Sequence, residues 1–341
     1  MSSRKIGFAF NRFILALILI LTLSACNSDK ANNKTTEQAT SSPSPTATEQ
    51  QPASKDAEPA KAGSKGYLWK ITGDHNSGYL AGTIHIARKD MYPLDEDLEQ
   101  AIDEADYIAL ELDLTKVDQK KTVELVNEKA LLTDGTTLRD HVAEEDYEKF
   151  RSILKKSILS AAAATFDQYE PWYAAMTLES LPAMKYMTTD GIDQYIAKQA
   201  HKEGKTIIEL ESMESQLGIF DSFSKEMQEQ YFHQTVESAG TASTGLKQLL
   251  DMWTLGNLKL LETTHDQFEE EGKKTMGEQF KAYNDTFLVN RNVEMANKID
   301  QYLAEGEEGT YLVAVGSLHM VGEQGLVSLL EKKGYTVEFV K

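Results

Sequence analysis

Two short motifs of the form Gly-x-x-His limit what this chain can fold into. Gly-Thr-Ile-His at 82–85 follows the apolar run 79–81, and Gly-Ser-Leu-His at 316–319 follows the apolar run 311–315. Short apolar runs that break at a glycine are typical of buried strands. Each histidine is therefore expected just beyond the end of a strand. Two such units in matching context, far apart in the chain, predict one shared site that the fold assembles.

A structural role for both histidines is the alternative. Gly-x-x-His is a loose pattern, and a histidine after a strand is often a hydrogen-bonded structural residue. The repetition of the motif leaves a structural role and a ligand role open for His85 and His319. In either case Gly82, Thr83 and Gly316 are expected to form the turns that lead out of the strands.

The first 26 residues have the pattern of an export signal. Basic residues at 4, 5 and 12 precede the apolar run 13–23, and small residues lead to Cys26, the only cysteine of the chain. The run is too short for a comfortable transmembrane helix, and the order of these features is that of a secretory signal. Leu-Ser-Ala-Cys at 23–26 resembles the lipidation box of bacterial lipoproteins. We therefore predict a lipoprotein signal peptide over 1–26, with a lipid on Cys26 holding the protein at the extracytoplasmic face of the cell membrane; simple secretion is the alternative.

The next segment, 27–65, is predicted to be a disordered tether, and 66–341 a folded domain. The tether is rich in Ser, Thr, Ala, Pro, Asn, Gln and Lys and has no aromatic residue. Such a segment buries too little apolar surface to offset the entropy of ordering it. The net charge of -19 lacks the basic footprint that nucleic acids need, so we expect no nucleic-acid partner and no electrostatic contact with anionic lipid.

Strand and helix patterns alternate after residue 66, which predicts an α/β fold with a mixed central sheet and long helical insertions. Segments 68–72 and 78–83 are predicted to form a hairpin. Further strands are expected at 107–114, 206–211, 311–315 and 335–339. The insertions, 115–187 and 212–279, show the apolar spacing of amphipathic helices.

Carboxylates occur in two of these predicted strands. Glu111 and Asp113 are two residues apart in a strand, so both are expected to point the same way. A charge among apolar neighbours is costly unless it is paired or bound to a metal. An edge strand with one wet face is the alternative. Glu211 is expected where its own strand ends.

Other polar and aromatic residues have simpler interpretations. Arg291 lies inside a predicted helix over 287–299, where a role in the site and an ion pair on the helix surface are both open. Histidines expected at the surface are His75, His141, His233 and His265. Residues expected in the core are Trp172, Tyr173 and Met176.

The predicted strands bring these groups to one place. In open α/β sheets, ligands bind at the carboxyl ends of the strands. His85, Glu111, Glu211 and His319 all lie near such ends. Two imidazoles with one or two carboxylates form a ligand set suited to a divalent transition metal. A metal held in this way lowers the pKa of a bound water and polarises a carbonyl.

An ordered set of short motifs resembles the TraB/GumN family, which also includes the pheromone-shutdown proteins and the Tiki-type metalloproteases. The motifs are Gly-Thr-Ile-His at 82–85, Leu-Glu-Leu-Asp at 110–113, Tyr-Glu-Pro-Trp at 169–172, Gly-Ile-Asp at 191–193, Leu-Glu-Ser at 210–212 with Gln216, Arg-Asn at 291–292, and Val-Gly-Ser-Leu-His at 315–319 with Gly322 and Gly325. Each motif is weak, but their order is specific. The resemblance covers nearly all of the chain after residue 66.

The resemblance implies a fold similar to the erythromycin-esterase and ChaN-like proteins, with the two histidine motifs meeting at the site. From the Tiki branch it implies peptide cleavage that depends on a divalent metal such as Mn, Co or Zn. By position, His85, His319 and Glu111 would be the ligands. Glu211 would be a further ligand or the general base, and Arg291 would neutralise an oxyanion or a substrate carboxylate.

Three functions are compatible with the sequence. The first is a membrane-tethered, extracytoplasmic metallohydrolase that acts on peptides or a small secreted substrate. The second is a module that captures a secreted peptide, such as a pheromone, without chemistry. The third is an esterase that uses Ser317, although no Gly-x-Ser-x-Gly elbow surrounds this serine, and a small turn residue is the simpler interpretation.

Overall fold

The described part of the chain folds around one mixed sheet. The computed structural model describes residues 63–340. Six strands lie in the order β4-β3-β5-β2-β1-β6. They span Tyr67–Thr72 (β1), Ser77–Thr83 (β2), Tyr107–Leu110 (β3), Thr206–Glu209 (β4), Thr310–Gly316 (β5) and Thr336–Phe339 (β6). The predicted α/β class and mixed sheet are confirmed; the likeness to the erythromycin-esterase and ChaN-like fold stays a prediction.

Four strands of the sheet end at the same edge. β4, β3, β5 and β2 are parallel, whereas β1 is antiparallel to β2 and β6. At the carboxyl ends, Thr83 of β2 pairs with Gly316 of β5. Leu110 of β3 pairs with Ala314 of β5 and with Glu209 of β4. The segments that leave these strands therefore start side by side.

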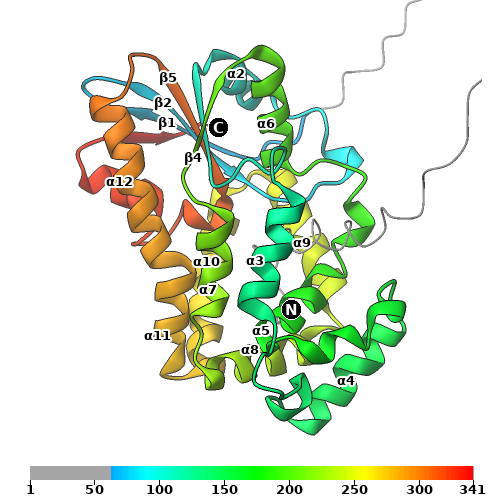
Figure 1. The fold of residues 1–341 in the computed structure, drawn as a ribbon. Coiled ribbons are helices and arrows are strands. Elements are labelled where there is room, and N and C mark those ends of the chain that lie inside the picture. The colour runs from blue at the N-terminus through cyan, green and yellow to red at the C-terminus, as the bar shows by residue number, and fades with distance from the viewer. Residues whose placement is uncertain (1–62, 341) are drawn as a thin grey trace, which may run out of the picture.

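Helices cover both faces of the sheet. They are α2 (Glu96–Glu104), α6 (Ile192–Glu203), α12 (Asn290–Glu305) and α13 (Leu326–Lys332). The connections β2 to β3 and β3 to β4 run in one direction across the sheet, and β4 to β5 runs back. Right-handed crossovers therefore place α2 and α6 on one face and α12 on the other, as Figure 1 shows.

A helical body lies beyond the carboxyl edge of the sheet (Figure 1). The chain enters it from β3 and again from β4, which is why it sits at this edge and not at the other. Its elements are α3 (Gln119–Ala130), α4 (Glu144–Lys155), α5 (Pro171–Ser180), α7 (Met213–Asp221), α8 (Lys225–Ser238), α9 (Ala242–Leu255), α10 (Leu258–Met276), α11 (Gln279–Asn284) and the π-helical turn η7 (Asp285–Val289).

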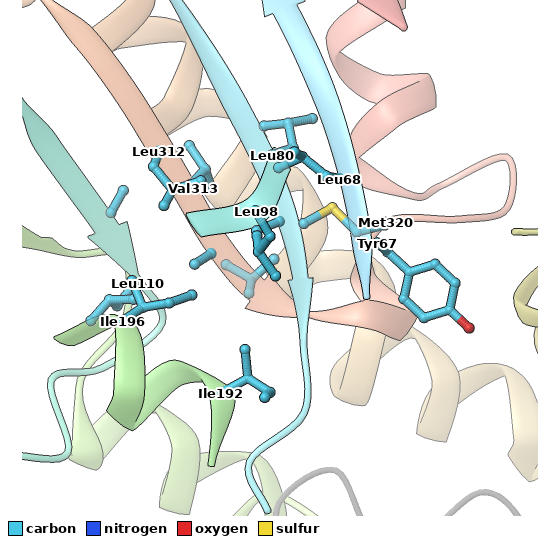
Figure 2. Packing of buried hydrophobic residues seen from close by; sticks show 14 of the residues in the cluster. Tyr67, Leu68, Leu80, Leu98, Leu110, Ile192, Ile196, Leu312, Val313 and Met320 are labelled. Atoms are coloured by element: carbon cyan, nitrogen blue, oxygen red, sulfur yellow. The ribbon is translucent and has the colours of Figure 1, made fainter. Parts of the chain in front are cut away.

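The buried apolar residues form two clusters. The first joins the sheet to α2, α6, α12 and α9, and Figure 2 shows Leu80 and Leu312 of the strands grouped with Leu98 of α2 and Ile196 of α6. The second fills the helical body. Its members include all three residues predicted for the core, Trp172, Tyr173 and Met176.

Two predicted strands are too long. β3 ends at Leu110, because the chain then turns through bonds from the Leu114 amide to the Leu112 carbonyl and from the Lys116 amide to the Asp113 carbonyl, each 3.1 Å. β4 ends at Glu209. Glu111 and Glu211 thus follow their strands. Since β3 lies between β4 and β5, the edge-strand alternative is wrong.

The predicted signal peptide with Cys26, and residues 27–62 of the predicted tether, lie outside the described residues. Ser64 is already buried and forms a bridge with Leu94, so contacts with the domain begin before residue 66. Between residues 63 and 340, no helix combines the length and the apolar character needed to cross a bilayer.

Candidate functional site

His85 leaves the end of β2 and is held by the start of α6. Its Nδ1 lies 2.9 Å from the Oδ2 of Asp193, whose side chain is almost fully buried. The Ile192 amide donates to the Ile84 carbonyl at 3.0 Å. At Gly191 an added Cβ would lie 2.1 Å from the His85 carbonyl oxygen, so only glycine lets α6 approach this closely.

His319 leaves the end of β5 in the 3-10 turn η8 (Ser317–His319) and is fully buried. Its Nδ1 is bonded to the Oδ1 of Asn292 on α12. The Asn292 amide group donates to the Gln324 carbonyl at 2.7 Å, which fixes the orientation of this side chain. The other ring nitrogen, Nε2, is buried and makes no hydrogen bond within the described residues.

Glu111 follows β3 and lies beside His319. Its Oε1 accepts the Gly316 amide at 2.7 Å and is 4.0 Å from the Nε2 of His319. Its Oε2 accepts from the Nη2 of Arg291 at 2.9 Å. A Cβ at residue 316 would lie 3.3 Å from Oε1, so the glycine there leaves room for the carboxylate.

Arg291 joins the two glutamates of the site. Its Nε and Nη2 each donate to Glu211 at 2.7 Å, in the bidentate geometry typical of arginine and carboxylate. Its Nη1 donates to the Phe287 carbonyl at 3.1 Å. Gln216 donates to Glu211 at 2.9 Å. Arg291 is 6% exposed, so this is a buried ion pair and not one on the helix surface.

The two imidazoles differ in protonation. Burial opposes a charge on His85, but Asp193 and then Glu111 outweigh it and raise the pKa of His85 to about 9. Burial, the charge of Arg291 and the charge of His85 hold the pKa of His319 well below its usual value. Burial also disfavours the Glu211 carboxylate, but Arg291 outweighs it and lowers the pKa of Glu211. The side chains therefore lie close enough to act on one another's charges.

The chemistry of the donors fits a divalent metal in part. Each histidine engages Nδ1 with an outer oxygen, from Asp193 or Asn292, as histidine ligands of metals almost always do. With Nδ1 engaged, the Nε2 of each ring is the nitrogen left for a ligand. The Nε2 of His319 is buried and makes no hydrogen bond in the described part of the chain. Among residues 63–340, however, no three His, Cys, Asp or Glu side chains already stand at the spacing of a metal cluster. Arg291 and the Gly316 amide occupy Glu111 instead.

Gly82, Thr83 and Gly316 were predicted to form turns, but they are paired residues at the ends of β2 and β5. They hold the two motifs together. Gly82 accepts from the indole nitrogen of Trp253 at 2.8 Å through its carbonyl. The Thr83 carbonyl accepts from the Ser317 hydroxyl at 2.8 Å, which links the end of β2 to η8. Ser317 is buried and acts as a turn residue, with its hydroxyl already engaged. Its position gives no support to the esterase hypothesis.

Asp113 and His265 were wrongly predicted. Asp113 does not share the direction of Glu111, because the strand ends before both; its Oδ2 lies 2.7 Å from His201 and its Oδ1 accepts from Thr115. His265 is 7% exposed and not solvated, since α10 packs it against Gly322 in the loop after His319. His75 and His233 are exposed as expected, and His141 is partly buried.

Three residues of the site were named in the sequence only as members of the short motifs, with no role assigned to them. Asp193, Asn292 and Gln216 orient His85, His319 and Glu211 respectively. Each lies in or beside one of the short motifs, and this position was the sequence feature that pointed to the site. Nothing in the local pattern states which side chain each one bonds.

A family model for the TraB/PrgY/gumN family matches residues 67–339. The chain belongs to this family. The predicted membership is thereby confirmed, and the match spans all six strands and every site residue described above.

Several curated proteins are similar to the chain. A metalloprotease TIKI homolog of Nematostella vectensis is 22% identical over 81% of this chain and 67% of its own length. Metalloprotease TIKI1 of Danio rerio is 22% identical over 80% of this chain and 62% of its own. The uncharacterized protein YbaP of Escherichia coli is 25% identical over 74% of this chain and 87% of its own. The chain thus spans about two thirds of the TIKI relatives. No solved structure matches significantly.

Proposed function

We propose that this protein is a metal-dependent hydrolase that cleaves peptides at the extracytoplasmic face of the membrane, to which a lipid on Cys26 tethers it. The observation that carries the proposal is the pair of imidazoles at one sheet edge, each with Nδ1 held by an outer oxygen, and the Nε2 of His319 lies 4.0 Å from Glu111. The metalloprotease relatives named above support the reaction class.

His85, His319 and Glu111 would hold the metal. A divalent ion such as Mn, Co or Zn would supply the Lewis acidity that activates a water and polarises a carbonyl. Asp193 and Asn292 fix the orientation of the two rings. Metal binding at His85 competes with its proton, since ligation requires the neutral ring.

Arg291 and Glu211 have different parts in this proposal. Arg291 already donates to Glu111 and is positioned to neutralise negative charge that develops on a substrate beside it. Glu211 is bound through two donors of Arg291 and one of Gln216. A carboxylate held in this way, with a lowered pKa, is a weak base. The geometry therefore favours Glu211 as the residue that positions Arg291.

Metal content tests the proposal directly. We expect the purified full-length chain to bind about one divalent ion, measured by elemental mass spectrometry. His85→Ala and His319→Ala should lose the ion together with peptide cleavage. His75→Ala is the matched control, because this histidine is exposed in the β1–β2 loop. A double variant of His85 and His319 that keeps its metal would exclude the site.

Capture of a peptide without cleavage is the second candidate. The observation in its favour is that Arg291 and the Gly316 amide already compensate the Glu111 carboxylate without an ion. Incubation with candidate peptides, followed by mass spectrometry, separates the two functions. Intact peptide that co-purifies with the chain indicates capture, and new peptide termini indicate hydrolysis.

A further inference from the structure

A small apolar cavity lies beside His85, and we propose that it is the subsite that accepts one small aliphatic side chain of the peptide substrate. This inference rests on the proposed function, because it assigns a specificity pocket to the same site. The cavity would select the amino acid of the substrate beside which the peptide is bound or cleaved.

The cavity has a volume of about 60 Å³ and lies between the sheet edge and the helical body. His85, Thr83, Gly316 and Ser317 form its polar side. Apolar side chains line the rest: Tyr67, Ile84, Leu249, Met252, Trp253, Leu261 and Leu318. The two histidine motifs therefore form one wall of the cavity, and α9 and α10 of the helical insertion form the other.

Three of the polar side chains in this lining, those of Trp253, Tyr67 and Ser317, are already engaged. The Trp253 indole donates to the Gly82 carbonyl at 2.8 Å, and the Tyr67 hydroxyl donates to the Met252 carbonyl at 3.2 Å. The Ser317 hydroxyl donates to the Thr83 carbonyl at 2.8 Å. A polar side chain placed here would lose its water without gaining these partners, which is costly. An aliphatic side chain has no such cost and gains by leaving water.

The volume limits the size of the occupant. An apolar cavity of about 150 Å³ admits benzene. The cavity beside His85, at about 60 Å³, is smaller than that and suits an alanine or valine side chain but not an aromatic ring. Leu249 is only partly buried, unlike Met252 and Leu261, so its side chain is the part of the wall nearest to solvent.

The position of the cavity connects it to the reacting groups. Gly316, whose amide holds Glu111, belongs to its lining, and so does His85. A substrate side chain seated in the cavity would therefore bring its own peptide bonds next to His85 and Glu111. This is the arrangement that a specificity pocket needs, since it converts side-chain binding into positioning of the scissile bond.

Binding can be measured without any cleavage. The probes are acetylated, amidated pentapeptides Ser-Gly-X-Gly-Ser in which X is Gly, Ala, Val or Phe. Because Trp253 lines the cavity, its fluorescence reports occupancy in the full-length chain. We expect the Val peptide to bind roughly tenfold more tightly than the Gly peptide. The Phe peptide should bind no more tightly than the Gly peptide. Equal binding of all four peptides overturns the subsite.

Leu249→Ala tests the wall of the cavity. Removing this side chain enlarges the cavity. The affinity for the Phe peptide relative to the Val peptide should therefore rise roughly tenfold, and the ratio of their cleavage rates should rise with it. Leu260→Ala is the matched control, because Leu260 is 38% exposed on α10 and does not line the cavity. An unchanged Val-to-Phe ratio in Leu249→Ala contradicts the proposal. A Val preference in binding without any new peptide termini would leave the subsite standing and reject the hydrolase.

Discussion

At the scale of single residues, Arg291 is the group on which both glutamates of the site depend. Three of its N–H groups reach Glu111 and Glu211, and its own side chain and both carboxylates are less than a tenth exposed. A buried ion pair is weak evidence for stability, but removal of one partner leaves the other charge buried and unpaired. The arginine therefore fixes the two carboxylates more than it strengthens the fold.

Replacement of Arg291 should reveal this dependence. We expect Arg291→Met to lower the free energy of unfolding by about 3–5 kcal/mol, because two buried carboxylates lose their cation. Urea denaturation measures the change. Arg139→Met is the control, since Arg139 pairs with Glu144 at an exposed position and should cost no more than about 1 kcal/mol. Equal losses in the two variants would contradict the buried network.

The residues at the site were predictable as a set, but not their bonds. His85, His319, Glu111 and Glu211 could be placed at one edge because apolar runs mark the strands before them. The direction predicted for the Asp113 side chain was wrong because it depends on where the strand ends. A shift of one residue reverses the side to which a side chain points. The local pattern also gives no sign of a bond between residues as distant as His85 and Asp193.

At the scale of elements, the start of α6 packs against the backbone of His85 and positions its side chain. The contact requires a glycine, because an added Cβ at residue 191 would meet backbone and not a flexible side chain. Asp193 lies in the first turn of the helix and reaches His85 only while α6 stays in place. The orientation of this ring is therefore a property of the helix position.

Gly191→Ala should move α6 away from His85. We expect the free energy of unfolding to fall by about 1–3 kcal/mol, as for other overpacked sites, and the metal content to fall with it. Gly218→Ala is the control: nothing lies within 4 Å of its added Cβ, and it sits inside α7. Since alanine suits a helix interior better than glycine, this variant should be stabilised by about 0.5–1 kcal/mol. Normal stability and metal content in Gly191→Ala would show that α6 is not what holds His85.

Element positions followed from the sequence better than element ends did. The centres of β2, β3, β4 and β5 lie in the apolar runs that predicted them. The ends of β3 and β4 fall earlier than predicted, and after β3 the chain turns at residues 112–116. The predicted helix 287–299 likewise begins as the π-helical turn η7 and continues to Glu305 as α12.

At the scale of the whole molecule, the site lies at the carboxyl edge of the sheet, where the helical body begins (Figure 1). One apolar cluster joins the sheet to α2, α6, α12 and the inner side of α9, and the other fills the rest of the helical body. The sheet contributes the histidines and Glu111, and the insertion that includes α9 and α10 contributes the far wall of the cavity beside His85. Variation in the insertion can therefore change the bound side chain without altering the groups at the sheet edge.

The proposed tether determines where such a site would act. Leu-Ser-Ala-Cys at 23–26 predicts that Cys26 is the only lipid attachment point, and the net charge of -19 disfavours an additional electrostatic contact with anionic lipid. We expect Cys26→Ser to abolish incorporation of labelled fatty acid and to shift the chain from the membrane fraction to the soluble fraction. Ser28→Ala, two residues away, should change neither. Cys26→Ser that still sediments with membranes and carries label would mean that another segment anchors the protein, and a peptide-directed site would then need a different explanation for its location.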